Sequence, residues 1–341
     1  MMTYEENLLP KISFIIPTLN AAWILQKCLF AIRDQVYPQK KVEIVIADGG
    51  STDNTIIIAK QYNAIVINNP LVNQEPGKSL AAEKATGKLL FFTDADNIIV
   101  GQEWIHSMVK PYLENKNIKG FIPQTTAPPD SNSFNQYLGY LFTDPFTWFV
   151  YGNASNPKDY EKYYTPIKST KDYKIYKFLT KNHPLFGLAQ GVGTIKTFKK
   201  NGIGLYDDIL AGIKLIGEGG YIAYIPSAFV YHYHIKNVFD FVNKYRWRIR
   251  NNLTQKIKGF GMVNRNQFMS RDRQLRRVLF IPYSLSIILP FFDSLLLTAK
   301  YKNFVMLWHT LACVILAITI TYELFLFKIG VRIKPSEIYG K

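Results

Sequence analysis

Hydrophobic residues in the amino-terminal third of the chain follow two alternating patterns. Short continuous apolar runs predict buried strands of a parallel sheet. These runs are Ile12–Thr18, Val42–Ala47, Ala64–Ile67 and Leu89–Thr93. Apolar residues at helical spacing between the runs predict crossover helices. These helices are Ala22–Val36, Thr52–Tyr62 and Ser79–Thr86. Strand and helix alternate, which is typical of a right-handed, doubly wound α/β sheet.

The centre of the chain is less regular. Residues Pro123–Pro184 are rich in Tyr, Phe, Asn and Pro, and we interpret them as an insertion that shapes a substrate site or touches a membrane. An ordinary packed helix at Tyr137–Phe149 is an equally open interpretation. Regular structure is expected again at Lys196–Asn201, followed by short strands at Tyr221–Pro226 and Ala228–His232.

Two long apolar stretches lie in the last quarter, Val278–Ala299 and Phe304–Phe327. Each is close to the roughly 20 residues that span a bilayer, so together they predict a helical hairpin in a membrane. Pro282, Pro290 and Asp293 would also suit a kinked or interfacial helix in the first stretch. A hydrophobic helical pair in a soluble protein stays open as well.

Charge favours an anionic partner. Lys and Arg outnumber Asp and Glu by 41 to 25 over 341 residues, a net charge of +16, which suits nucleic acid, acidic lipid or a phosphorylated small molecule. Basic residues on both flanks of the apolar stretches favour cytoplasmic ends for the hairpin. They are Arg265, Arg271, Arg273, Arg276, Arg277, Lys328, Arg332 and Lys334. Lys300 and Lys302, between the stretches, weaken this asymmetry.

Targeting and cysteine signals add little. Residues 1–11 lack the charged-then-apolar pattern of a signal peptide, so the amino-terminal domain is expected to stay in the cytoplasm. Cys28 and Cys313 lie in segments of different character, which indicates neither a disulfide framework nor a zinc cluster.

Acidic residues follow two of the predicted strands. Asp94-Ala95-Asp96 ends the fourth run and would suit a divalent metal carrying a nucleotide diphosphate, although solvated turn residues are the simpler interpretation. Asp48, before a glycine turn and a helix start, can accept from a base or ribose. Lys78 follows Pro76-Gly77 in an incomplete phosphate loop; it can approach a phosphate or be a surface lysine.

Five sequence pieces, in this order, resemble family 2 glycosyltransferases of the GT-A fold. They are Ile15-Ile16-Pro17-Thr18-Leu19-Asn20, Ala47-Asp48-Gly49-Gly50-Ser51-Thr52-Asp53-Asn54-Thr55, Gly77 with Ala81-Ala82, Ala85-Thr86-Gly87-Lys88, and Asp94-Ala95-Asp96. The resemblance runs from Lys11 to about Leu253 and is weakest in the insertion. It implies a GT-A type α/β fold with a doubly wound, mainly parallel, Rossmann-like sheet, to which the chain adds the carboxyl-terminal hydrophobic hairpin.

The resemblance also suggests a domain plan. A glycosyltransferase domain would occupy residues 1–255, with a nucleotide-sugar-binding half at 1–125 and an acceptor-binding half at 126–255. A basic amphipathic linker would follow at 256–277, and the membrane-associated hairpin with its basic tail at 278–341.

Site roles follow from the same resemblance. Residues expected to bind the nucleotide sugar are Pro17, Thr18, Asn20, Asp48, Gly49, Ser51, Lys78, Asp94 and Ala95. Asp94 and Asp96 would hold Mn2+ or Mg2+ as a DxD motif, with His232 preferred to His234 as a third ligand.

The catalytic base is expected in the pair Asp207-Asp208, with Asp208 the preferred residue. Family members usually have a longer stretch before this pair and another acidic residue two positions after it, where this chain has Leu210. A pair of acidic residues at a helix amino terminus is the alternative interpretation.

A further resemblance lies in Asn243-Lys244-Tyr245-Arg246-Trp247, which is similar to the Gln-x-x-Arg-Trp motif of membrane-bound family members. It implies that Arg246 meets a phosphate and Trp247 stacks on the acceptor sugar. A basic amphipathic helix against lipid headgroups explains Arg246, Arg248 and Arg250 at least as well.

The expected function is inverting, metal-dependent transfer of a sugar from a UDP- or GDP-sugar to a lipid-linked or polysaccharide acceptor at the cytoplasmic face of the cell membrane. The alternative is a non-catalytic, membrane-anchored partner protein with a degenerate transferase domain, suggested by the shortened acidic region. Nucleic acid is not expected as a partner, because no basic recognition helix is visible.

Overall fold

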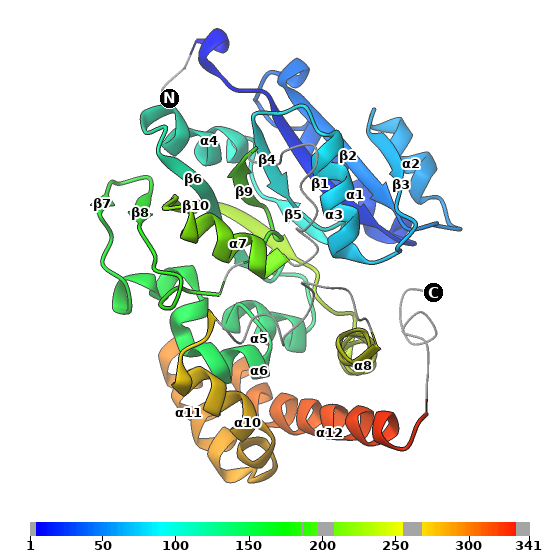
Figure 1. Cartoon of the computed structure of the whole chain (residues 1–341), viewed down its shortest axis with the longest axis vertical. Helices are drawn as coiled ribbons and strands as arrows, with labels where there is room; N and C mark the ends of the chain where they lie inside the picture. The colour runs from blue at the N-terminus through cyan, green and yellow to red at the C-terminus, as the bar shows by residue number, and fades with distance from the viewer. Residues whose placement is uncertain (1–4, 186, 197–207, 255–267, 332–341) are drawn as a thin grey trace. The chain divides into compact units, whose positions relative to one another are not determined.

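The computed structural model describes residues 5–185, 187–196, 208–254 and 268–331 (Figure 1). The chain divides into two compact units. Unit 1 contains Met1–Thr125 and Tyr160–His232, and unit 2 contains Thr126–Asp159 and Tyr233–Lys341. The expected boundary after residue 125 coincides with a unit boundary. The expected acceptor half, 126–255, is instead shared between the units, because the chain leaves the unit 1 core after residue 125 and returns to it at Tyr160.

Four parallel strands form one side of the unit 1 sheet in the order β3-β2-β1-β4. They are β1 (Ile12–Thr18), β2 (Val42–Asp48), β3 (Ile65–Asn68) and β4 (Leu89–Phe92). All four were predicted from their continuous apolar runs, and β1, β2 and β4 are almost entirely buried. Thr18 and Asp48 are register partners, so the ends of β1 and β2 lie side by side.

The sheet continues beyond β4 as β9-β6-β10-β8-β7, with β5 paired to β10. These strands are β5 (Asn97–Ile99), β6 (Ile118–Thr126), β7 (Lys168–Ser169), β8 (Lys174–Tyr176), β9 (Val192–Ile195) and β10 (Tyr221–His232). The two short strands predicted over 221–232 are one continuous strand, and Pro226, which was expected to separate them, lies within it. Residues 197–201, where regular structure was expected, lie outside the described residues.

Helices pack against this sheet (Figure 1). They are α1 (Ala22–Arg33), α2 (Thr55–Gln61), α3 (Gln74–Lys84), α4 (Trp104–Glu114) and α7 (Asp208–Gly217), with short 3-10 turns at η1 (Glu6–Leu8) and η2 (Gln39–Lys41). Helix α3 begins five residues before the predicted start at Ser79. Pro76 is tolerated there, because the first N–H groups of a helix have no partner within it. Lys78 therefore lies on a helix and not in a phosphate loop.

Unit 2 is helical. Its elements are α5 (Ser133–Leu141), α6 (Pro145–Tyr151), η3 (Gly152–Ser155), α8 (Val238–Thr254), α10 (Arg271–Leu285), α11 (Ile288–Tyr301), η6 (Phe304–Leu307) and α12 (Trp308–Lys328); η4 (Pro157–Lys162) crosses the unit boundary. The helix considered over Tyr137–Phe149 is two helices. Phe142 ends the first with a left-handed φ of 68°, and the Asp144 side chain caps the second by accepting from the Thr147 N–H at 2.9 Å.

The predicted carboxyl-terminal stretches differ from each other. The first is broken: α10 and α11 meet at an angle of 98°, and Ile287 between them has a left-handed φ of 60°. This is the kinked alternative. The second is the continuous helix Phe304–Lys328, with mean hydropathy 2.1 and length sufficient to cross a membrane, although 39% of its most apolar window is buried inside the protein. A spanning hairpin therefore stays a prediction.

Candidate active site

The Asp48 carboxylate organises the loop after β2. Its Oδ1 accepts from the N–H groups of Gly50 (3.0 Å) and Ser51 (2.8 Å), and its Oδ2 accepts from the hydroxyls of Thr18 (2.8 Å) and Ser51 (2.6 Å). A carboxylate has about four acceptor positions, so these four donors fill it. Asp48 would therefore reach a base, as predicted, only by giving up one of these bonds.

The loop after β1 is bonded to the same turn. Asn20 has a left-handed φ of 48°, donates its N–H to Ser51 Oγ (2.8 Å) and accepts from the Thr52 N–H (2.9 Å). A Cβ added at Gly49 would lie 3.2 Å from the Val72 carbonyl oxygen, so the backbones pack closely there. The two predicted nucleotide-binding loops thus form one preorganised rim.

Pro17 lies beneath this rim. It is a buried residue of β1, and a Cβ added at Gly77 on α3 would lie 3.3 Å from its Cβ. Pro17 thus packs against α3, and its expected contact with a nucleotide stays a prediction.

The Asp94–Asp96 segment makes the turn that its spacing predicted, between β4 and β5. Asn97 closes the turn by donating its N–H to the Asp94 carbonyl (3.0 Å) and accepting from the Asp94 N–H (3.0 Å). Its amide also donates to Asp96 Oδ1 at 3.0 Å. Ala95 is only 8% exposed within the turn. Asn97 orients Asp96, and its position directly after the acidic pair could have indicated this.

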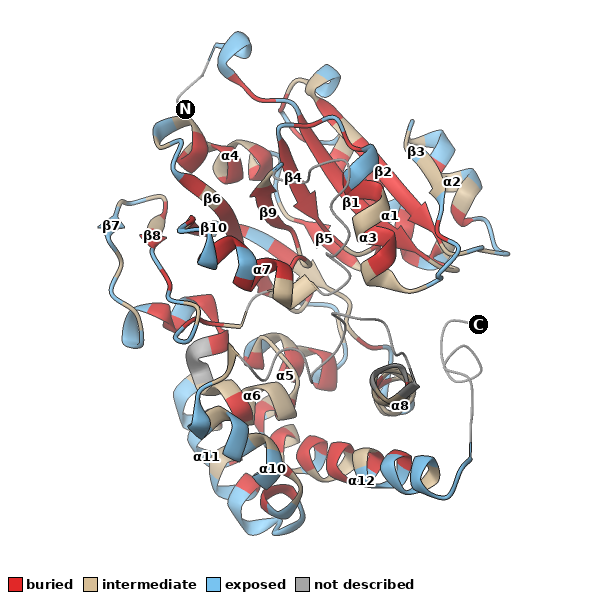
Figure 2. Ribbon diagram, in the orientation of Figure 1, coloured by how far each residue is buried: buried red, intermediate tan, exposed pale blue. Residues whose placement is uncertain are grey.

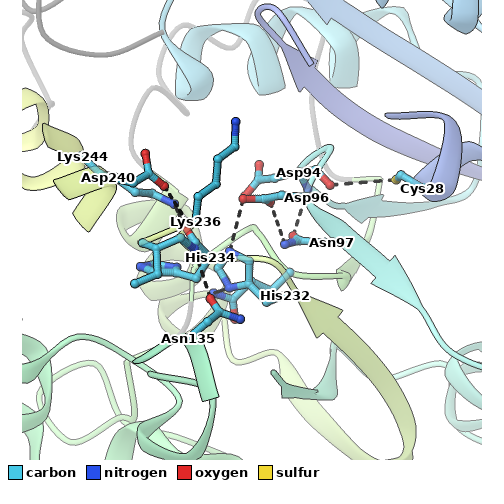
Figure 3. Close-up of polar contacts among 12 residues, drawn as sticks. Cys28, Asp94, Asp96, Asn97, Asn135, His232, His234, Lys236, Asp240 and Lys244 are labelled. Atoms are coloured by element: carbon cyan, nitrogen blue, oxygen red, sulfur yellow. Dashed lines mark hydrogen bonds and ion pairs between the residues drawn. The ribbon is translucent and has the colours of Figure 1, made fainter. Parts of the chain in front are cut away.

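Strand pairing brings His232 to Asp96. Asn97 and His232 are register partners of β5 and β10, and His232 Nε2 lies 3.6 Å from Asp96 Oδ2 (Figure 3). The Gln190 amide nitrogen lies 3.4 Å from the other ring nitrogen, Nδ1. Nothing in the sequence indicated Gln190. His234, the less preferred ligand, lies beyond the end of β10 and belongs to unit 2, so of the two histidines only His232 is on this strand.

The Asp94 carboxylate pairs with Lys78. Lys78 is only 4% exposed, and its Nζ lies 3.1 Å from Asp94 Oδ1. Burial alone would lower the pKa of Lys78, but the carboxylates of Asp94, Asp208 and Glu75 outweigh this effect and raise it. The ammonium is therefore a fixed charge among three carboxylates.

A small pocket opens at this group. It is lined by Glu75, Lys78, Ser79, Ala82, Phe92, Leu188 and Asp208. Asp208 is the first residue of α7, and a Cβ added at Gly187 would lie 2.8 Å from its Oδ2. Glycine at 187 thus leaves room for the Asp208 carboxylate. Asp207, its predicted companion, lies outside the described residues.

Comparison with known proteins agrees with this geometry. Residues 13–182 match the sequence profile of the family described as "Glycosyl transferase family 2". The chain belongs to glycosyltransferase family 2. Its fold is similar to that of the mannosyltransferase PcManGT from Pyrobaculum calidifontis, solved with GDP-Man and Mn2+, with a TM-score of 0.50 and 15% identity over 92% of this chain and 88% of that one. The predicted fold class is confirmed.

Two curated relatives are matched over part of their length. Glycosyltransferase AglE of Haloferax volcanii is 39% identical over 103 residues, which are 28% of this chain and 34% of that protein. Glycosyltransferase GlyA of Streptococcus pneumoniae is 26% identical over 245 residues, which are 70% of this chain and 31% of that protein. The chain thus spans about a third of the length of each relative.

The metal ligands predicted for this family 2 glycosyltransferase are brought together only in part. Asp96 and His232 converge, whereas the Asp94 carboxylate faces Lys78. Within the described residues, no group of three or more His, Cys, Asp and Glu side chains could hold a metal ion. A carboxylate and an imidazole suit Mn2+. The two residues therefore supply part of a ligand set, which donor diphosphate oxygens would complete.

The predicted acceptor residues lie on α8 in unit 2. Arg246 Nε lies 2.6 Å from Glu323 Oε1 of α12, and Arg250 pairs with the other oxygen of the same carboxylate. Glu323 and Arg250 are fully buried. Arg246 thus has an ionic partner within the protein, and Trp247 is partly buried. Contact of either residue with an acceptor stays a prediction.

Proposed function

We propose that this chain transfers a sugar from a nucleotide-sugar donor, a UDP- or GDP-sugar, to a lipid-linked or glycan acceptor at the cytoplasmic face of the cell membrane, with inversion. One observation carries the proposal. The carboxyl ends of β1, β2 and β4 gather a hydrogen-bonded Asp48 rim, a buried Lys78–Asp94 pair and a separate Asp96–His232 pair. Ligands of open α/β sheets bind at this edge.

The donor would bind across the rim. Because the four acceptor positions of the Asp48 carboxylate are already used, the rim would contact base and ribose through other groups. These include Gly49, whose N–H is bonded to the Thr18 carbonyl, and Ser51 and Asn20, which are bonded to each other. Lys78 would exchange Asp94 for a phosphate oxygen of the donor, since a buried ammonium binds phosphate as a point charge. This exchange would free Asp94 to meet the ribose and the metal.

Asp96 and His232 would hold Mn2+ or Mg2+ together with Asp94. The ion, when bound, neutralises the charge that develops on the departing nucleoside diphosphate. Asn97 keeps Asp96 oriented through its amide at 3.0 Å, and Gln190 contacts the far side of the His232 ring. Such supporting contacts fix a ligand before the ion arrives.

Asp208 would act as the base. Its carboxylate would take the proton of an acceptor hydroxyl as that oxygen bonds to the anomeric carbon and the bond to the diphosphate breaks. The position of Asp208 supports this role, because its side chain lines the same pocket as Lys78, the residue expected to meet the donor diphosphate.

The membrane location rests on the carboxyl-terminal helices. Helix Phe304–Lys328 is long and apolar enough to enter a membrane, and α8 carries the basic residues expected near an anionic, lipid-linked acceptor.

A donor panel tests the proposal. The purified chain would be incubated with labelled UDP-, GDP- and dTDP-sugars, with and without Mn2+. We expect one donor class to bind and to be turned over in the presence of metal. Asp208→Asn should retain donor binding and lose transfer. Absence of binding for every donor would contradict the proposal and favour the non-catalytic alternative.

A further inference from the structure

Unit 2 exposes a large apolar area. Along α10, α11 and the start of η6, large apolar side chains face solvent, with exposed fractions of 67% for Val278, 64% for Ile288, 68% for Leu296 and 81% for Phe304 (Figure 2). We call α10, α11 and η6 together the apolar surface. Soluble monomers rarely leave such a continuous apolar area uncovered, so a partner is expected there.

Helix α11 carries few charges, and both of its charged side chains have partners within the protein. It contains two charged residues in Ile288–Tyr301, Asp293 and Lys300. The Tyr283 hydroxyl donates to Asp293 at 2.6 Å, and Lys300 pairs with Asp159 at 2.8 Å. The partner of α11 is therefore apolar.

The beginning of α10 has the opposite character. Arg271, Arg273, Arg276 and Arg277 lie within its first two turns, ahead of exposed Val278 and Leu279. Asp272 is the acidic residue among them and pairs with Arg276 at 3.1 Å. Basic residues that adjoin an apolar helix face match an anionic lipid leaflet in both charge and polarity.

Helix α12 is held in a way that opposes crossing the bilayer. Its buried residues include Glu323, which binds Arg246 and Arg250 of α8. Helix α8 contains four basic residues and one acidic residue, namely Lys244, Arg246, Arg248, Arg250 and Asp240. Because Glu323 lies five residues before the end of α12, a crossing α12 would have to keep this ion group and α8 at the headgroups, since charges in the hydrocarbon are strongly unfavourable.

Neither of the other two helices is long enough to cross a membrane alone. Helix α11 has 14 residues, fewer than the roughly 20 that a crossing needs. The 98° bend at Ile287 turns α10 away from its axis, so the pair is not one straight span.

We propose that unit 2 is monotopic: its apolar surface docks in the plane of an anionic lipid bilayer, with the α10 arginines at the headgroups, and no helix crosses. This replaces the membrane hairpin expected from sequence. The inference extends the membrane part of the proposed function, and its readout is lipid binding and not sugar transfer. Failure of one therefore leaves the other standing.

Vesicle flotation tests the docking. The full chain should float with vesicles of phosphatidylcholine and phosphatidylglycerol, and more weakly with phosphatidylcholine alone. Leu296→Asp should weaken vesicle binding by at least about tenfold, because it removes one large apolar side chain from the surface that the lipid would bury. Arg271→Glu should weaken binding to the anionic vesicles by about fivefold or more.

Ile57→Asp is the matched control. Ile57 is 58% exposed on α2 of unit 1, so the same type of change there should leave flotation unchanged. Equal loss in Leu296→Asp and Ile57→Asp would overturn the proposal. So would a lipid-free dimer, detected by light scattering, that Leu296→Asp dissociates while the parent protein does not bind vesicles. In that case a second copy covers the surface.

Site-directed labelling tests the in-plane arrangement. Lys302→Cys and Lys328→Cys are exposed and lie on either side of the apolar helix. Both native cysteines are buried, so the parent protein gives the background. With sealed vesicles and a membrane-impermeant maleimide, we expect equal labelling at the two positions. Labelling at one position with protection of the other until detergent is added would show that α12 spans, and would overturn the proposal.

Discussion

Unit 1 and unit 2 each bury an unbalanced group of charges, and they do so with opposite sign. In unit 1, buried Lys78 lies among Asp94, Asp208 and Glu75 at a pocket. In unit 2, fully buried Glu323 lies between Arg246 and Arg250, and none of the three lines the pocket at Lys78. The comparison suggests that the charged group beside the pocket, at Lys78, can bind a ligand. The buried group at Glu323 instead stabilises the folded protein.

The largest expected effect is on the buried group at Glu323. Glu323→Ala would leave two arginines, one of them fully buried, without their carboxylate, and we expect a loss of about 3–5 kcal/mol in the free energy of unfolding. Chemical denaturation measures this loss. Asp272→Ala is the control, because its exposed pair with Arg276 should contribute only about 0.3–0.5 kcal/mol. Similar values for the two variants would break the comparison.

Substitutions at the candidate active site should lower the rate of sugar transfer and not the stability. Asp96→Asn keeps the size of the side chain but loses the charge that a metal requires, so transfer should fall by about 100-fold or more while thermal stability changes little. Initial rates over a range of Mn2+ concentrations measure this. Asp130→Asn, an exposed site in unit 2, should match the parent. Full activity in Asp96→Asn would support the non-catalytic alternative.

Lys78 tests whether the pocket cation is exchangeable. If Lys78 moves from Asp94 to the donor diphosphate, Lys78→Met should weaken donor binding by about 10- to 150-fold, the range for a charge-assisted hydrogen bond. Calorimetric titration with the nucleoside diphosphate measures the affinity. A variant that binds donor normally but unfolds easily would instead make Lys78 a structural counterpart of Glu323.

Substitution of Glu43 is expected to have the smallest effect. Its carboxylate is hydrogen-bonded within unit 1 and does not line the candidate pocket. It accepts from Ser13 Oγ (2.5 Å) and from the Thr86 N–H (2.8 Å), at the end of the sheet opposite the candidate site. Burial alone would raise the pKa of Glu43, but these hydrogen bonds outweigh it and lower the pKa below its ordinary value of 4.5.

A lowered carboxyl pKa fixes the sign of the pH dependence. The stabilisation is fully present above pH 4.5, the unfolded value, and is lost as pH falls through the folded value. Glu43→Gln should cost about 1–3 kcal/mol near neutrality, and the difference from the parent should shrink in acid. Denaturation at several pH values measures it. A difference that grows in acid would contradict this assignment.

Local patterns predicted the nucleotide side of the fold well. The strands β1, β2, β3 and β4 and the turn at Asp94–Asp96 follow from apolar runs and turn residues, because these are interactions between near neighbours. The partners that complete the site are distant in sequence. His232 reaches Asp96 only through the pairing of β5 with β10, and Gln190 contacts His232 only because the chain returns to the sheet. No local signal encodes such contacts.

The sequence by itself determined the α/β alternation, the acidic turn and an apolar carboxyl terminus, since each depends on the order of residue types. The tertiary structure decided which charge each charged residue meets. It paired Asp94 with Lys78 and Arg246 with Glu323, and it directed four hydrogen-bond donors to the Asp48 carboxylate. The physical reason is that a buried charge must be compensated by whatever group the fold brings within reach, and that partner is a property of the packed chain.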